Sequence, residues 1–317
     1  LQPYTQYRDF ATFMTDYLDQ LVMGPRYMGI NIVEMLLCFD EAGEVSLTEK
    51  EKDCLKQWQA LTDASNNSEI VKMAKATFAR YDDVINDEIQ FRYVLQSVRA
   101  IDSVGCDKTL RDIHIACQLY GVIDHLCKPL SDKMMKLVED EITLPFARKA
   151  VLDLNDKYLA IQKRDISKSA SLKSADAVKE MSDGEKILRK LIEPYKGKII
   201  LLDIWGTWCG PCKAALSHSQ EEYERLAPYD MVFLYLANRS SDESWKNVIK
   251  EYNVTGDNVV HYNLPDEQQS AVEHFLKVSS FPTYKLIDEE GNILDVDAAP
   301  RNLNRLEQLV KLMKGNN

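Results

Sequence analysis

The residues of this sequence best suited to chemistry are two cysteines, Cys209 and Cys212, with two residues between them. They follow an apolar run of strand length over residues 199–205 and open a helix that we expect over residues 211–226. The first turn of a helix carries unpaired N–H groups and a partial positive charge, and both favour a thiolate over a thiol. We therefore expect thiol–disulfide exchange, with Cys209 as the exposed attacking sulfur and Cys212 as the resolving thiol.

Two cysteines at this spacing also occur as half of a zinc site. Such a site needs a second pair of cysteine or histidine ligands. After Cys212 the chain has no further cysteine and only three histidines, His218, His261 and His274. Because a strand precedes the pair and a helix follows it, we favour the redox interpretation and expect no metal site.

One carboxylate, Asp203, lies inside the apolar run, shortly before Cys209. Burial of a carboxylate is costly unless the group has a partner or a function. We interpret Asp203 as a proton acceptor and donor for Cys212. The alternative is a buried aspartate that is satisfied by an ordinary hydrogen bond.

Up to residue 164 the sequence pattern is helical, because apolar residues recur at steps of three and four with little sign of strands. One apolar stripe runs from Tyr4 to Leu21, and Thr48 with Glu51 is expected to form a capping box at a helix start. We expect five to seven helices that pack as a bundle or irregularly.

The character of the chain changes at residue 165. Over residues 165–183 serines alternate with Lys and Asp, and we interpret this stretch as a linker. From residue 184 strand and helix patterns alternate. The sequence thus predicts an α-helical domain of unknown function over residues 1–164, the linker, and an α/β domain over residues 184–317 with a mixed central sheet flanked by helices.

Five of the seven cysteines lie in the helical region: Cys38, Cys54, Cys106, Cys117 and Cys127. His114 and Cys117 share a face of one expected helix, but His125 lies about 16 Å further along the axis, too far for one metal ion to join them. We interpret Cys106, Cys117 and Cys127 as buried small hydrophobes outside disulfides. A metal, or a disulfide with another helix, stays open as an alternative.

Composition excludes several classes of protein. The 317 residues, 45% apolar and 28% charged, are enough for two globular cores. A net charge of −11 without a dense basic stripe argues against nucleic-acid binding, and no run of eighteen apolar residues predicts a membrane span. Because the chain starts at Leu1 rather than Met, we expect a processed or truncated chain and leave open a signal segment or membrane anchor before it.

The C-terminal part of the sequence resembles the thioredoxin superfamily. Residues 202–213, which contain the motif WCGPC, resemble the active-site strand and helix of thioredoxins. Residues 280–284 resemble the segment with a cis proline, and residues 287–292 resemble the hairpin after it. The extra helix and strand expected over residues 242–262 suit the TlpA-like branch, which comprises extracytoplasmic thiol–disulfide oxidoreductases of bacteria. The resemblance covers about residues 184–317.

This resemblance implies roles for the matching residues. Cys209 matches the nucleophile, Cys212 the resolving cysteine and Asp203 the buried acid. A cis peptide bond between Phe281 and Pro282 is implied as well, although a trans bond is the more common state of such a pair. The resemblance implies no cofactor beyond the redox-active disulfide. The implied substrate surface comprises Trp208, Gly210, Pro211, Phe281, Pro282 and Thr283.

The sequence departs from thioredoxins on the strand that follows the active-site helix. Thioredoxins often place a lysine there, near the buried acid. Residues 233–236 of this chain are Phe-Leu-Tyr-Leu and contain no lysine. The redox potential therefore does not transfer from the family to this chain.

Together these inferences form a functional hypothesis. We expect a thiol–disulfide oxidoreductase, a reductase more than an oxidant, that exchanges disulfides with protein cysteines and receives electrons from a donor protein. The alternative enzyme is a disulfide isomerase. The non-enzyme alternative is a helical partner-binding protein with a redox-regulated thioredoxin-like module. By the resemblance we expect a periplasmic or otherwise extracytoplasmic location.

Overall fold

The computed structural model describes residues 30–61 and 69–315. The chain divides into two compact units, Leu1–Val122 with Leu130–Leu154, and Ile123–Pro129 with Asn155–Asn317. The apolar stripe expected from Tyr4 to Leu21 lies outside the described residues. No helix within the described ranges is both long enough and apolar enough to cross a membrane.

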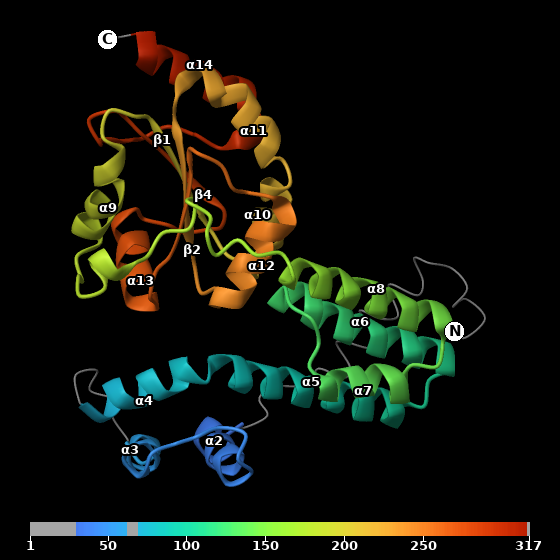
Figure 1. Cartoon of the computed structure of the whole chain (residues 1–317). Coiled ribbons are helices and arrows are strands. Elements are labelled where there is room, and N and C mark those ends of the chain that lie inside the picture. Colours follow the sequence, from blue (N-terminus) through green and yellow to red (C-terminus); the bar gives the residue numbers. More distant parts are fainter. Residues whose placement is uncertain (1–29, 62–68, 316–317) are drawn as a thin grey trace. The chain divides into compact units, whose positions relative to one another are not determined.

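The described part of the first unit is helical, as the sequence predicts (Figure 1). Thr48 accepts the N–H of Glu51 at the start of α3, and the Glu51 carboxylate accepts the N–H of Thr48, which confirms the predicted capping box. Leu36 and Leu55 are fully buried in the small apolar core that α2 to α5 share. The helices before residue 165 are α2 (Ile32–Glu41), α3 (Glu49–Gln59), α4 (Glu69–Arg80), α5 (Asp82–Val104), α6 (Lys108–Leu126), α7 (Asp132–Glu141) and α8 (Pro145–Gln162).

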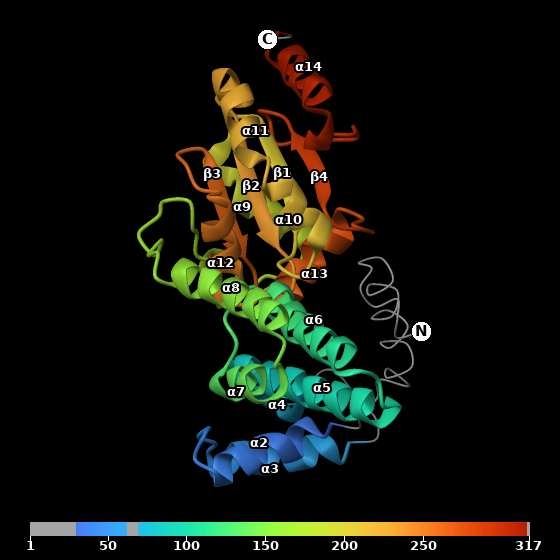
Figure 2. The same cartoon turned by 90° about the vertical axis from the view of Figure 1, so that its right-hand side faces the viewer.

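A mixed sheet of five strands forms the centre of the second unit, in the order β3-β2-β1-β4-β5 (Figure 2). β1 and β3 both pair with β2 in parallel, whereas β4 pairs with β1 and β5 in antiparallel orientation. β1 is buried on both faces, as its apolar composition predicts. The strands are β1 (Ile200–Trp205), β2 (Val232–Ala237), β3 (Val259–Asn263), β4 (Thr283–Ile287) and β5 (Ile293–Leu294).

Helices cover both faces of this sheet, so the predicted α/β fold is confirmed. Leu202 and Ile204 point into the core that β1 shares with α9 and α13. Because side chains alternate along a strand, Asp203 points to the opposite face, on which α10 and α11 lie (Figure 1). The helices of this part are α9 (Gly184–Ile192), α10 (Gly210–Leu216), α11 (Ser219–Leu226), α12 (Asp242–Tyr252), α13 (Asp266–Phe275) and α14 (Leu303–Gly315).

The single helix predicted over residues 211–226 is wrong in one respect, because the structure has two helices there, α10 and α11. The hydroxyl of Ser217 donates to the carbonyl of Ala214, and the N–H of His218 donates to the carbonyl of Ala215. The second of these is a backbone bond that reaches back three residues rather than four, so the α-helical ladder is interrupted at this point.

The stretch interpreted as a linker, residues 165–183, packs along the edge strand β3. Leu172 forms a parallel β-bridge with His261, whose N–H donates to the carbonyl of Ser171. The Ser171 hydroxyl donates to the carbonyl of Gly256, and Ser171 is buried. These bonds give the exposed edge of β3 backbone partners over part of its length.

The end of α6 belongs to the second unit and receives hydrogen bonds there. The last carbonyls of a helix lack partners inside the helix. Lys213 donates to the carbonyl of Asp124, Ser244 to that of Leu126, and Asn247 to that of Cys127. The α/β unit thus includes a helix end that its own side chains cap.

Because α9 lies close to α13, we predict that a residue larger than glycine destabilises the fold at position 184. A Cβ atom at this position would lie 2.0 Å from the carbonyl oxygen of Ala271. A backbone atom can move away from this Cβ atom only if the backbone is displaced. We therefore expect Gly184→Ala to lower the free energy of unfolding of the α/β unit by about 1–3 kcal/mol. Chemical unfolding monitored by circular dichroism measures this change.

The matched control is Gly315→Ala, because nothing lies within 4 Å of a Cβ atom there. We expect its effect to stay within about 0.5 kcal/mol. Equal destabilisation by both substitutions would contradict the steric argument.

Candidate active site

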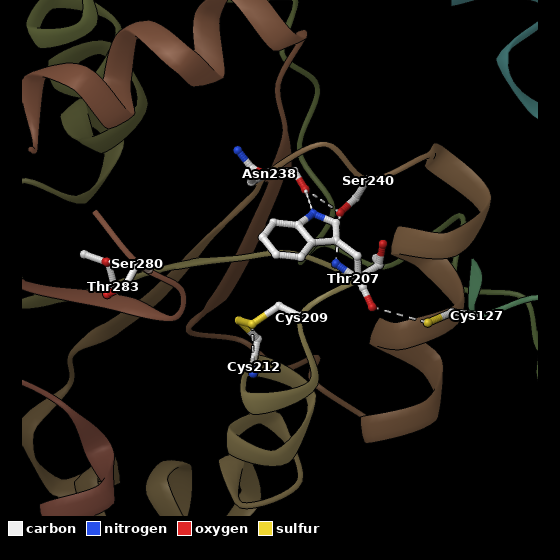
Figure 3. The surroundings of a disulfide bond; sticks show 9 residues. Cys127, Thr207, Cys209, Cys212, Asn238, Ser240, Ser280 and Thr283 are labelled. Atoms are coloured by element: carbon white, nitrogen blue, oxygen red, sulfur yellow. Dashed lines mark hydrogen bonds between the residues drawn. A yellow bond between two sulfur atoms is a disulfide. The ribbon is translucent and has the colours of Figure 1, made fainter. Parts of the chain in front are cut away.

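Cys209 and Cys212 form a disulfide at the start of α10, with an S–S distance of 2.07 Å (Figure 3). Cys209 is the N-cap residue of α10, and its sulfur accepts the N–H of Cys212 at 3.2 Å. The sulfur therefore occupies the position of a capping oxygen, where a negative charge is stabilised by backbone N–H groups. This placement at the junction of strand and helix is the one that the sequence predicts.

The prediction that Cys209 is exposed is wrong for the disulfide form. Cys209 is 4% exposed and Cys212 is 1% exposed. In a disulfide each sulfur covers part of the other, and the Cys209 sulfur is also directed at the N–H of Cys212.

Trp208 is an exposed aromatic residue beside the disulfide. Its indole Nε1 donates to the carbonyl of Asn238, and its ring meets that of Phe281 edge to face, with 5.2 Å between centroids. Gly206 makes room for this indole, since a Cβ atom there would lie 2.6 Å from Nε1. Ser240 accepts the N–H of Thr207, the residue before Trp208 (Figure 3). The aromatic flank of the site is therefore held by hydrogen bonds and packing.

The bond between Phe281 and Pro282 is cis, as the resemblance implies. Pro282 precedes Thr283, the first residue of β4, which stands opposite Ile204 near the end of β1. Since the cysteine motif follows the same end of β1, strand pairing brings the proline segment to the motif. The sequence predicts both segments, and the antiparallel register of β4 joins them.

A cavity of about 930 Å³ opens beside the active-site helix. Pro211 lines it from the motif, and Phe281, Pro282 and Thr283 line it from the proline segment. The remaining lining residues include Ala214, Ala215, His218, Glu221, Glu222, Tyr284, Asp297 and Arg301. Four of the predicted substrate-surface residues thus line the same cavity, and Trp208 contacts one of them, Phe281.

Asp203 is buried, as predicted, with 6% of its surface exposed. Its strand neighbours are Tyr235 in β2 and Tyr284 in β4. Within the part of the chain that the structure describes, its Oδ1 atom is buried without a hydrogen-bond partner. This oxygen therefore lacks the ordinary hydrogen bond that the alternative interpretation of Asp203 requires. Burial, and then the negative charge of Glu222, raise the pKa of Asp203 well above the usual range of a carboxyl group.

Glu222 is a residue that our sequence reasoning missed. It lies on the buried face of α11 and lines the cavity, although only 7% of its surface is exposed. Burial, and then the charge of Glu221, raise the pKa of Glu222 to about 7. A sign was present in the sequence, because Ser219, Glu222 and Leu226 follow one another at helical spacing on one face.

The cysteines of the helical region do not share one environment. Cys127 is buried as predicted, Cys106 is partly exposed, and the prediction of a buried Cys117 is wrong because this residue is exposed. The buried stripe of α6 passes through Ile115 and Leu119 on a different face of the helix. Burial raises the pKa of Cys127 to about 11, which keeps it a thiol. Its sulfur lies 3.6 Å from the carbonyl oxygen of Thr207 (Figure 3).

The histidines weighed as metal ligands lie in separate settings. His114 is buried and its Nε2 lies 2.7 Å from the hydroxyl of Ser97, whereas His125 is exposed. His261 is buried against Tyr235, with its Nε2 at the carbonyl of Val254. Among the residues that the structure describes, no three histidine, cysteine or carboxylate side chains gather as a metal site.

Comparison with known proteins agrees with this geometry. Residues 197–293 match the family described as Thioredoxin-like. The chain is 26% identical over 129 residues to the thiol-disulfide oxidoreductase ResA of Bacillus thuringiensis subsp. konkukian, a match that covers 41% of this chain and 69% of that protein. It is 26% identical over 158 residues to the thioredoxin-like protein YneN of Bacillus subtilis, covering 49% of this chain and 86% of that protein.

A solved structure is also similar, the thioredoxin domain of a thiol-disulfide oxidoreductase from Bacteroides vulgatus. Its identity is 21%, its TM-score is 0.33, and the match covers 38% of this chain and 84% of that one. The strand order, the cis proline and the cysteine pair at the start of α10 are observed directly in the present chain. Residues 197–293 therefore form a thioredoxin-like domain, and the relatives to which the C-terminal part of this chain is similar include proteins named thiol–disulfide oxidoreductases.

Proposed function

We propose that this protein reduces disulfides of client proteins through the Cys209–Cys212 pair. The observation that carries the proposal is the disulfide at the N-cap of α10, beside the cis bond that precedes Pro282. The names of the relatives support exchange between thiols and disulfides as the class of reaction.

Cys209 is the nucleophile in this proposal. In the reduced protein its sulfur stands at the helix start, where the N–H of Cys212 and the helix dipole favour the thiolate. The thiolate attacks one sulfur of the client disulfide and forms a mixed disulfide. The other client sulfur leaves as a thiolate and takes a proton from solvent.

Cys212 resolves the mixed disulfide, and Asp203 serves as its proton acceptor. The Cys212 thiol passes its proton to the Asp203 carboxylate, and the resulting thiolate attacks the Cys209 sulfur. The bond between Cys209 and the client breaks, the client leaves reduced, and the protein is left oxidised. A base for Cys212 supports a reductase rather than an isomerase, because prompt resolution ends each encounter in net reduction.

The substrate surface in this proposal combines the motif with the proline segment. Trp208 and Phe281 present aromatic surface, and Gly210 and Pro211 add backbone that a client strand can approach. The backbone of Phe281 and Thr283 on either side of Pro282 offers hydrogen bonds to an extended segment. The cavity that these residues line together supports this grouping of Pro211 with the proline segment.

The proposal needs no cofactor beyond the redox-active disulfide, since the dithiol itself carries the two electrons. Each turnover leaves Cys209 and Cys212 joined as a disulfide. A donor protein with its own dithiol must then reduce this pair. We propose a periplasmic or otherwise extracytoplasmic location, which rests on the resemblance to the TlpA-like branch. Oxidising compartments are where clients of such a reductase occur.

Substitution of the nucleophile gives the first test of this function. We expect Cys209→Ser to reduce insulin no faster than dithiothreitol alone, because a serine hydroxyl is not ionised at neutral pH and cannot replace the thiolate. The turbidity of reduced insulin measures the rate. Cys117→Ser, which alters an exposed cysteine of the helical unit, is the matched control and should retain the wild-type rate. Wild-type activity in Cys209→Ser would exclude the assigned role.

Removal of the resolving cysteine gives the second test. We expect Cys212→Ser to accumulate a mixed disulfide between Cys209 and the client, because no second thiolate releases it. Mass spectrometry of non-reduced complexes identifies the client and the bonded cysteine. Recovery of scrambled ribonuclease activity by the wild-type protein, at a rate above that of simple reduction, would favour the isomerase instead.

A further inference from the structure

The cavity beside the active-site helix contains a carboxyl group that the proposed exchange does not use. Glu222 lines this cavity on α11 and is more than nine-tenths buried. Within the described ranges its carboxylate forms no hydrogen bond or ion pair. A buried carboxyl without a partner is expensive, so its presence needs an explanation.

Asp203 is a second carboxyl group in the same layer of the fold. It points from β1 to the face of the sheet that α10 and α11 cover, and its buried Oδ1 has no partner among the described residues. The charge of Glu222 acts on Asp203 and also on Tyr284, the strand neighbour of Asp203 that lines the cavity. Glu222 and Tyr284 line the same cavity, and Asp203 neighbours Tyr284 and points to the face of the sheet that α11 covers, so the two carboxyl groups lie on the same side of the sheet.

Burial raises the pKa of both groups. The pKa of Glu222 is raised to about 7 by burial and then by the charge of Glu221. Burial and then the charge of Glu222 raise the pKa of Asp203. A negative charge on Glu222 therefore opposes the ionisation of Asp203.

Other titratable and charged groups act on this pair or line the same cavity. Burial raises the pKa of the tyrosines, so they stay uncharged at neutral pH. Arg301 is a cation at the cavity, but its guanidinium lies 3.9 Å from Asp297 and is largely exposed. The groups are Tyr223 and Glu221 from α11, Tyr235 from β2, Tyr284 from β4, His218 from the turn before α11, and Asp297 and Arg301 after β5.

We propose that Glu222 is a positioning residue for thiol–disulfide exchange, whose charge acts on Asp203 from the side of the cavity. The inference rests on the proposed function and deepens it. The charge on Glu222 sets how firmly Asp203 keeps its proton. It therefore sets the pH at which Asp203 accepts the proton of Cys212. In this chain a buried acid on α11 accompanies Asp203, whereas thioredoxins often have a lysine on the strand that follows the active-site helix.

Protons and electrons balance in the resolving step. Asp203, as the carboxylate, takes the proton of the Cys212 thiol, and the Cys212 thiolate attacks the Cys209 sulfur of the mixed disulfide. The bond between Cys209 and the client breaks, and its electron pair leaves with the client sulfur. Two electrons pass from the dithiol to the client, and the proton on Asp203 returns to solvent.

The first arm of the test measures Asp203 directly in the oxidised full-length protein. Carbon-13 labelling of aspartate carboxyl groups follows the titration by NMR, and Asp203→Asn assigns the signal. We expect Glu222→Gln to lower the titration midpoint of Asp203 by about one pH unit or more, because a nearby like charge is removed. Glu224→Gln, an exposed acid on the same helix, is the matched control and should leave the midpoint unchanged.

The second arm measures function. The reduced protein is mixed with a peptide disulfide, and the single-turnover rate is recorded from about pH 5 to about pH 9. We expect the rate profile of Glu222→Gln to move to lower pH by the same interval as the Asp203 midpoint. Glu222→Asp, which keeps the charge, should stay near the wild-type profile and guards against a merely structural effect.

The outcomes separate this inference from the function on which it rests. An unchanged Asp203 midpoint in Glu222→Gln, or an equal shift in Glu224→Gln, would overturn the carboxyl pair. A shifted midpoint with an unshifted rate profile would overturn its role in exchange. Failure of the proposed function appears differently, as a wild-type rate no greater than that of Cys209→Ser, and the NMR arm still decides whether the pair exists.

Discussion

The junction between β1 and α10 is the constraint on which the rest of this site depends. β1 is central in the sheet, pairs on both edges and is buried on both faces, so the position of its last residue is fixed. Only a short turn separates Trp205 from Cys209, and the Cys209 sulfur caps the helix that follows. Because β4 pairs antiparallel with β1, the segment that contains Pro282 arrives at the same end. One strand thus sets the position of both halves of the exchange surface.

The buried layer below this surface contains two carboxyl groups rather than one, so its electrostatics differ from those around a single buried acid. Asp203 and Glu222 are both withdrawn from water, and no buried cation stands between them among the described residues. Lys213, the buried lysine next to the motif, is directed to Asp124 at the end of α6. The acid pair therefore faces uncharged tyrosines, and each carboxyl group is easier to protonate than it would be in water.

The α/β unit extends beyond the residues that match the thioredoxin-like family. It includes residues 123–129, whose carbonyls receive hydrogen bonds from α10 and α12, and the stretch before α9 that pairs with the edge of β3. Both additions form hydrogen bonds through backbone groups that would otherwise be exposed to solvent. The segments that link the helical region to the α/β core are thus part of that core's own hydrogen bonding.

Local patterns in the sequence determined the chemistry and most of the elements. The apolar run of β1, the cysteine pair after it and the buried Asp203 follow from residue types and spacing, and the cis bond before Pro282 follows from the family resemblance. Only the tertiary structure decided that Glu222 is buried on the side of the sheet to which Asp203 points, that Cys117 is exposed, and that Cys209 is covered in the disulfide form. The physical reason is that periodicity reports which residues share one face of an element. Which face another element covers, and which charges burial brings together, depends on strand pairing and helix packing between residues far apart in the chain.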